Sequence, residues 1–261
     1  MITEEAIKNV FEVYQKNKTM SLSTFGDSLW SSRVYFASHG LYIYAVIEKS
    51  RNYENILKNN RVSFVIEKGV PDLFIQGEGD VEILGKPDDC EKERALLFQK
   101  NIELIPFVKK IRDVLVIRIK PVKIFLSDFR TLFKPRKEIA VSDADLQRGL
   151  ELDRGEPAWK VYLKATRPFA FTATFISVLA GAGLAREIDP WLLLLTLAGV
   201  MLLHAGINAL NDLMDYRYGI DDWLVLGASR VLQDKLMTQR RHFTFIAFLI
   251  GLGCAVGAVL A

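Results

Sequence analysis

Hydrophobic and polar residues follow two different patterns along the chain, and the change falls near residue 165. Before it, charged and apolar residues alternate over short distances, as in a water-soluble protein. After it come three long apolar runs, over residues 169–185, 190–210 and 243–261. A helix needs about 17 apolar residues or more to cross a bilayer. The pattern therefore predicts a soluble part followed by three transmembrane helices.

In the first part, the periodicity predicts short strands with a few covering helices. Strands are expected over residues 19–24, 33–38, 41–47, 61–67, 72–84, 114–119 and 122–126, and helices over 3–16, 53–60 and 87–101. His39-Gly40 is expected to form a turn, and Pro121 to mark a bend or an edge within the strand run over residues 114–126. Many short strands of this kind favour an antiparallel barrel, which is closed and leaves no exposed edge. The predicted fold class is α+β.

The boundary between the two parts is expected over residues 134–156. Lys134-Pro-Arg-Lys137 is a short basic patch, and Ser142-Asp-Ala-Asp145 is typical of a helix start. Gly155 and Pro157 then interrupt the chain. We therefore expect a first domain over residues 1–133, a linker over 134–156 and a transmembrane segment over 157–261.

An acidic stretch follows the second apolar run. Read as a helix, His204, Asn208, Asn211 and Asp215 lie on one face, and Asp212 lies close to it. Carboxylates beside a membrane helix are costly unless they pair or bind an ion, so they indicate a functional site. Several oxygen ligands with room for water suit Mg²⁺ bridging to a phosphorylated substrate. The alternative is a solvated loop just outside the membrane.

The order of residues in this stretch favours the site. Asn-Asp-x-x-Asp-Tyr-x-x-Gly-x-Asp, from Asn211 to Asp221, resembles the first aspartate motif of the UbiA superfamily of membrane prenyltransferases. It is most similar to the menaquinone-type branch, which attaches a polyprenyl chain to a dihydroxynaphthoate ring. Two further stretches carry the resemblance, which covers about residues 157–261: Lys164-Ala-Thr-Arg167-Pro168, and Gly227-Ala-Ser-Arg230-Val-Leu-Gln233 followed by Leu236-Met-Thr.

The resemblance implies prenyl transfer from a polyprenyl diphosphate to an aromatic acceptor in quinone biosynthesis. Asp212 and Asp215 would be catalytic and, with Asn208 and Asn211, would hold Mg²⁺ on the diphosphate. Weaker candidates for contact with the diphosphate or the acceptor, which could equally be anchors at the membrane surface, are Arg167, Arg217 and Arg230.

The resemblance implies a larger helix bundle with a second aspartate motif in its later half. After Asp222 the present chain has only one further acidic residue, Asp234. The sequence therefore resembles the first part of such a bundle. We expect this chain, lacking the second metal-binding half, not to complete prenyl transfer by itself, so its status as an enzyme stays open.

The soluble part resembles the FMN-binding split barrels of the pyridoxamine-phosphate-oxidase-like superfamily, over about residues 5–130. The residues that carry this resemblance are Met20-Ser-Leu-Ser-Thr24, Arg33-Val-Tyr-Phe, Ser50-Arg51-Asn52 and Ile75-Gln-Gly77-Glu-Gly79. The resemblance implies that Arg33 and Arg51 hold the flavin phosphate and that the barrel forms a homodimer. Asn52 stands where Lys or His is usual, so FMN would be held more weakly by one charge-assisted contact.

Two alternatives remain for this part. Arg33 and Arg51 could be surface arginines whose aliphatic stems pack against the protein. If they do bind a flavin, the whole chain could instead be a membrane-anchored flavin-binding or oxidoreductase module. The helices would then serve only as a tether.

The net charge, the cysteines and the distribution of basic residues limit the functions and the topology that the sequence allows. The net charge of +3 is too small to indicate nucleic-acid binding. Cys90 and Cys254 lie in unlike surroundings and predict neither a disulfide nor a C-x-x-C metal site. The acidic, amphipathic N-terminus does not resemble a signal peptide. The connection over residues 213–242 is basic, which predicts a multi-pass membrane protein with this connection and the barrel in the cytoplasm.

Overall fold

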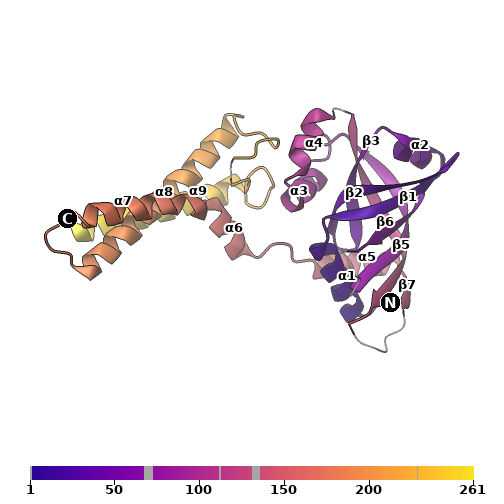
Figure 1. Cartoon of the computed structure of the whole chain (residues 1–261), viewed down its shortest axis with the longest axis horizontal. Coiled ribbons are helices and arrows are strands. Elements are labelled where there is room, and N and C mark those ends of the chain that lie inside the picture. Colours follow the sequence, from indigo (N-terminus) through magenta and orange to yellow (C-terminus); the bar gives the residue numbers. More distant parts are fainter. Residues whose placement is uncertain (1, 68–72, 112, 131–135, 228) are drawn as a thin grey trace. The chain divides into compact units, whose positions relative to one another are not determined.

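The computed structural model describes residues 2–67, 73–111, 113–130, 136–227 and 229–261. The chain divides into two units (Figure 1), a barrel unit over Met1–Gly155 and a helical unit over Glu156–Ala261. Asp72, Lys134, Pro135 and Ala228, which belong to predicted elements, lie outside the described residues.

Within the described residues, the barrel unit contains one antiparallel sheet of seven strands. They are β1 (Thr19–Phe25), β2 (Leu29–His39), β3 (Tyr42–Glu48), β4 (Arg61–Ile66), β5 (Leu73–Gly85), β6 (Val114–Asp128) and β7 (Lys137–Ala140). The strand order is β3-β2-β1-β4-β5-β6-β7, and β3 also pairs with β6. This last pairing closes the first six strands into a barrel, so the predicted closed antiparallel barrel is confirmed.

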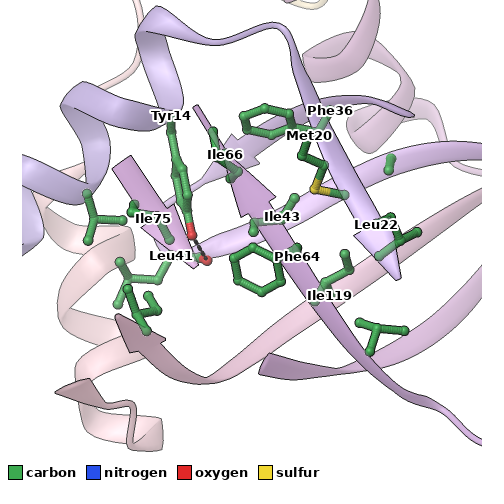
Figure 2. Close-up of a cluster of buried hydrophobic side chains, with 14 of the residues drawn as sticks. Tyr14, Met20, Leu22, Phe36, Leu41, Ile43, Phe64, Ile66, Ile75 and Ile119 are labelled. Atoms are coloured by element: carbon green, nitrogen blue, oxygen red, sulfur yellow. Dashed lines mark hydrogen bonds between the residues drawn. The ribbon is translucent and has the colours of Figure 1, made fainter. Parts of the chain in front are cut away.

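Large apolar side chains fill the barrel (Figure 2). Tyr14, Phe36 and Phe64 are fully buried there, and the rings of Tyr14 and Phe36 meet edge to face at 6.0 Å. Tyr14 comes from α1 (Glu4–Lys16), and its hydroxyl donates to the carbonyl of Leu41. At Gly77 an added Cβ would lie 2.3 Å from the Phe64 ring, so only glycine fits against this ring.

Four further helices belong to the barrel unit: α2 (Arg51–Lys58), α3 (Glu91–Lys100), α4 (Leu104–Lys110) and α5 (Asp143–Leu152). The short helix α4 was not predicted, because seven residues are too few for a clear helical period. The positive φ of Gly40 confirms the turn between β2 and β3.

The strand run predicted over residues 114–119 and 122–126 is confirmed as the single strand β6, and its ladder with β5 is irregular at Pro121, where a bend or an edge was expected. The register between β5 and β6 shifts between Glu78 and Gly79, and Pro121 lies opposite Gly79. A proline cannot donate to the ladder, but a register shift locally removes the need for that donor.

The segment expected to be a linker over residues 134–156 contains β7 and α5, which pack on the barrel. A capping box between Ser142 and Asp145 starts α5, and the same carboxylate accepts from the backbone N–H of Ile2 at 2.7 Å. Leu146 is buried in the barrel core. These contacts place residues 137–152 in the barrel unit, whose boundary with the helical unit follows Gly155.

The helical unit contains α6 (Ala158–Ala165), the 3₁₀ turn η1 (Pro168–Ala170), α7 (Phe171–Ala182), α8 (Pro190–Arg217) and α9 (Gln239–Leu260). By length and composition, α8 and α9 are candidate membrane spans, whereas the apolar segment Pro168–Ala182 is shorter. At 1.5 Å per residue this segment does not reach across a hydrocarbon core of about 30 Å. Two of the three predicted spans are therefore long enough.

Helices α8 and α9 pack closely through glycines. A Cβ added at Gly206 would lie 2.7 Å from Ile250 Cγ1, and one added at Gly253 would lie 2.7 Å from Leu203 Cγ. Small residues let the backbones of two membrane helices approach, which increases van der Waals contact between them.

Candidate functional site

Asp212 lies at the centre of the polar region of the helical unit. It is 2% exposed, although it lies on a candidate membrane helix. The guanidinium of Arg167, which precedes η1, forms an ion pair with its carboxylate. The backbone N–H of Ser229 donates to the other carboxylate oxygen at 3.4 Å. Asp212 thus joins three segments that are distant in sequence.

The other residues of the motif are less enclosed. Asp215 and Asn208 are half-buried, and Asn211 is exposed. The amide nitrogen of Asn208 is buried and has no hydrogen-bond partner. The carbonyl of Asp215 accepts from the N–H groups of Ile220 and Asp221, which fixes the turn after α8.

Negative charge gathers at this end of α8. Burial raises the pKa of the Asp221 carboxyl, and the nearby Asp215 raises it further, while Arg167 acts in the opposite direction. Among the described residues, no three His, Cys, Asp or Glu side chains are grouped to hold a metal ion. Of the four residues expected to hold a metal ion, Asp212 is paired with Arg167, and Asn211 is exposed.

Arg230 has a structural position in the connection between α8 and α9. Its guanidinium pairs with Asp234 at 2.8 Å and donates to the carbonyls of Trp223 and Val225 at 3.0 and 2.7 Å. The Arg230 side chain is 5% exposed, and its guanidinium is occupied by these contacts within the connection. Arg217, by contrast, is exposed and donates to the side chain of Gln239.

Two residues that the sequence did not single out as site residues are buried in this unit. Gln233 is buried, and its amide nitrogen has no hydrogen-bond partner. His242 is fully buried on α9, and its Nε2 lies 3.0 Å from the carbonyl of Ala209 on α8. For His242, the signal in the sequence was its position at the start of an apolar run.

The candidate flavin residues of the barrel unit do not converge. Arg33 is exposed and donates to the hydroxyl of Thr19 at 2.8 Å, and Arg51 lies over the ring of Trp30. Asn52 is buried, and its amide donates to Ser32 at 2.7 Å. Neighbouring residues of a strand face opposite sides, so Arg33 points away from the side that Ser32 shares with Asn52.

Asn52 is therefore occupied in fixing α2 to the barrel. Its side-chain oxygen accepts from the hydroxyl of Thr24, which also accepts from the amide of Asn55. Asn55 donates in addition to the carbonyl of Ser28. Sequence reasoning missed this network, because polar residues at helical spacing on a short helix indicate a solvated face as often as a buried one.

Several solved structures resemble the chain at low identity. Campylobacter jejuni ChuZ has a TM-score of 0.46 at 15% identity, covering 54% of this chain and 61% of its own. A heme binding protein from Mycobacterium smegmatis has a TM-score of 0.44 at 13% identity, covering 54% and 60%. A putative pyridoxamine 5'-phosphate oxidase from Listeria innocua has a TM-score of 0.37 at 19% identity, covering 46% and 97%.

Sequence comparisons concern the second part of the chain. The rat UbiA prenyltransferase domain-containing protein 1 is 34% identical over 131 residues, which are 46% of this chain and 38% of that protein. The human protein is 32% identical over 103 residues, which are 38% and 30%. The chain thus spans less than two fifths of these relatives. Residues 173–261 match the model of the UbiA prenyltransferase family, so the helical unit carries a domain segment of that family.

Proposed function

We propose that the helical unit binds the diphosphate of a polyprenyl diphosphate and takes part in transferring the prenyl chain to an aromatic acceptor. A dihydroxynaphthoate, as in quinone biosynthesis, is the acceptor that the motif favours. The observation that carries this proposal is the ion pair between Arg167, which is partly buried, and Asp212, which is almost fully buried. An ion pair beside a membrane helix is costly to desolvate, which favours a functional role.

Unused donors beside this pair favour an anionic ligand. The Nε of Arg167 is buried without a hydrogen-bond partner, and so is the amide nitrogen of Asn208. A buried donor without a partner costs about 1–3 kcal/mol. A diphosphate oxygen would satisfy such donors. Guanidinium groups are suited to this task because they present several N–H groups in one plane.

The same region suits a divalent cation. Asp212 and Asp215 lie one turn apart on α8, and the raised pKa of Asp221 reflects in part the charge of Asp215. Bringing carboxylates together is unfavourable unless a cation offsets their repulsion. Asp212 and Asp215, with amide oxygens of Asn208 and Asn211, would hold Mg²⁺. Bound there, Mg²⁺ would neutralise the diphosphate as the allylic C–O bond breaks. Arg167 would orient the carboxylate of Asp212, and Arg217 is an exposed candidate for contact with the acceptor.

The test is the substitution Asp212→Asn, assayed for binding of a labelled polyprenyl diphosphate with Mg²⁺ and for transfer to a dihydroxynaphthoate. Where transfer is measurable, its rate should fall at least ~10²-fold, because metal charge stabilisation supplies several kcal/mol. Met214→Ala changes an exposed side chain of the same helix and should alter neither. Unchanged binding and transfer in Asp212→Asn would contradict the proposed role.

We also propose that the chain crosses the membrane more than once, with the connection over residues 218–238 and the barrel unit in the cytoplasm. The basic residues around this connection support this orientation. Tyr218 is exposed and can be changed to cysteine in a Cys254→Ser background. A membrane-impermeant thiol reagent should then label it only after the cells are opened. Labelling in intact cells would reverse the orientation.

The alternative function, a membrane-anchored flavin-binding module, has less support. Asn52 is used within the barrel unit, and Arg33 and Arg51 contact Thr19 and Trp30 separately. The purified protein distinguishes the two functions. Flavin absorbance that survives gel filtration would favour the module, whereas diphosphate binding without flavin favours the transferase role.

A further inference from the structure

A groove of about 560 Å³ lies between α6 and the beginning of α9, apart from the aspartate motif. One wall is Tyr162 of α6. The remaining lining residues belong to α9: Arg240, Arg241, Thr244, Phe245 and Phe248. The groove therefore has two cations at one end and aromatic rings along the rest.

The wall formed by α6 is held in place by apolar contacts. Val161 and Ala165 of α6 are buried in one cluster with Val231 and Met237 of the connection before α9. The ring of Tyr162 meets that of Phe245 edge to face at 4.8 Å. Because these contacts fix both walls, the groove does not have to form when a ligand arrives.

The charges of Arg240 and Arg241 are not neutralised within the described part of the unit, where neither guanidinium forms an ion pair with a carboxylate. Both residues lie in the first turn of α9, where the helix dipole is positive and cations are unfavourable. Their charges therefore do not complement the helix itself. They remain available to an anion from outside the protein.

The length of the groove along α9 indicates which kind of anion it would bind. α9 is a candidate membrane span, and Phe248 lies seven residues beyond Arg241, about 10 Å further along the helix axis. Phe248 is 62% exposed. An ion such as free phosphate would use only the arginines, whereas a phospholipid places its phosphate at the arginines and its acyl chain along the rings.

We propose that the groove between α6 and α9 binds an anionic phospholipid of the surrounding bilayer. Arg240 and Arg241 bind the phosphate of the headgroup, and Tyr162, Phe245 and Phe248 contact the upper part of one acyl chain. The site fixes α6 at the membrane surface. It shares no residue with the aspartate motif, so it does not depend on the proposed transferase role.

The experiment uses the full chain reconstituted in phosphatidylcholine vesicles that contain a trace of spin-labelled phosphatidylglycerol or spin-labelled phosphatidylcholine. Electron paramagnetic resonance measures the fraction of each lipid that the protein immobilises. We expect selective immobilisation of phosphatidylglycerol. Its relative affinity should fall roughly fivefold with Arg240→Gln or Arg241→Gln, and ~30-fold with both, since each basic residue contributes about 1 kcal/mol.

A matched control removes the same charge elsewhere. Arg154 and Arg186 are exposed and do not line the groove. The pair Arg154→Gln and Arg186→Gln should leave the preference for phosphatidylglycerol unchanged. Phe248→Ala should weaken binding of both labelled lipids while retaining the preference, because it shortens only the apolar wall. Circular dichroism should show the same helicity for every variant.

Three results would overturn the proposal. The first is equal immobilisation of the two labelled lipids by the wild-type protein. The second is an equal loss of preference in the control pair, which would indicate net charge rather than a site. The third is displacement of labelled phosphatidylglycerol by an equimolar polyprenyl diphosphate but not by unlabelled phosphatidylglycerol, which would assign the groove to the substrate.

Discussion

The barrel unit and the helical unit differ in how far their large apolar side chains are buried. In the barrel unit, the largest buried side chains are apolar or aromatic, among them Phe36 and Phe64, and most ion pairs lie on the surface. In the helical unit, Trp191 is 78% exposed, while Asp212 and Arg230 are almost fully buried. The first pattern suits water, and the second suits a bilayer, where polar groups must find partners inside the protein. This difference in burial agrees with the two candidate membrane spans of the helical unit.

The comparison is tested most directly by truncating one large apolar side chain to alanine in each unit. Phe64→Ala removes a buried ring from the barrel and should lower the free energy of unfolding of the barrel unit by about 3–5 kcal/mol. Leu192→Ala on α8 removes a side chain that is 55% exposed. It should change the stability of the helical unit in micelles by less than ~1 kcal/mol, because detergent contacts that side chain in both states. Denaturant titrations in buffer and in micelles measure the two values. Equal losses would contradict the comparison.

The buried charges of the helical unit provide the next test. Arg230→Met removes a buried guanidinium that pairs with Asp234 and donates to two carbonyls, which should cost about 3 kcal/mol. The connection over residues 218–238 should then open more often and be cleaved faster by protease. Arg217→Met removes an exposed arginine at the end of α8 and serves as the control. If both variants were cleaved at the wild-type rate, Arg230 would not hold the connection.

Close packing of α8 and α9 can be tested with two glycines of the same helix. Gly253→Ala places a methyl group 2.7 Å from Leu203 and should destabilise the helix pair by about 1–3 kcal/mol. Gly251→Ala meets nothing within 4 Å and should be neutral or slightly stabilising, because alanine favours the helix. Unfolding in a mixed-micelle titration measures both, and a reversed order would indicate that the two helices are not in close contact.

The last prediction concerns a lysine that the barrel unit partly buries. Burial lowers the pKa of Lys100 from 10.5 to about 7, while its ammonium group donates to the carbonyl of Tyr14 and lies over the ring of Phe36. Between these pH values the unfolded chain binds a proton that the folded protein binds less. The free energy of unfolding should therefore rise with pH by up to about 1.4 kcal/mol per pH unit in this window, and be independent of this group below it.

Lys100→Met keeps the length of the side chain and removes the titrating group. Its free energy of unfolding should follow a flatter line between pH 7 and 10 than that of the wild-type protein, and urea titrations at intervals of one pH unit are sufficient. Parallel lines for the two proteins would show that Lys100 is charged in the folded state throughout this range.

Much of the fold followed from local patterns. Alternation of apolar residues located most strands of the barrel, and the turn at Gly40 followed from a single glycine. The same reasoning did not predict that β7 and α5 pack on the barrel, because this packing depends on contacts between residues distant in sequence. Asp145 accepts from the backbone N–H of Ile2, 143 residues earlier, and Leu146 is buried in the barrel core. Periodicity indicates only local structure. It therefore could not show that these residues belong to the barrel unit and not to a linker.

The candidate site shows the same limit. The spacing of Asp212 and Asp215 placed both on α8, but nothing in it predicted that Asp212 is paired with Arg167 or that Arg230 is occupied by Asp234. Asn52 was expected near a cofactor because Ser50-Arg51-Asn52 resembles a phosphate-binding segment of the flavin-binding split barrels. Whether such a side chain faces a ligand or the interior depends on which strand residues lie beneath it, here Thr24 and Ser32.

The ion pair between Arg167 and Asp212 also bears on how the chain enters the membrane. Arg167 precedes Asp212 by 45 residues, so it leaves the ribosome first. A carboxylate carried by an apolar helix is a barrier to insertion while it is alone. When α8 arrives, the cation is already synthesised at the start of the preceding apolar segment. The two charges can then partition together as a neutral unit. We therefore expect insertion of α8 to depend on correct placement of the segment before it.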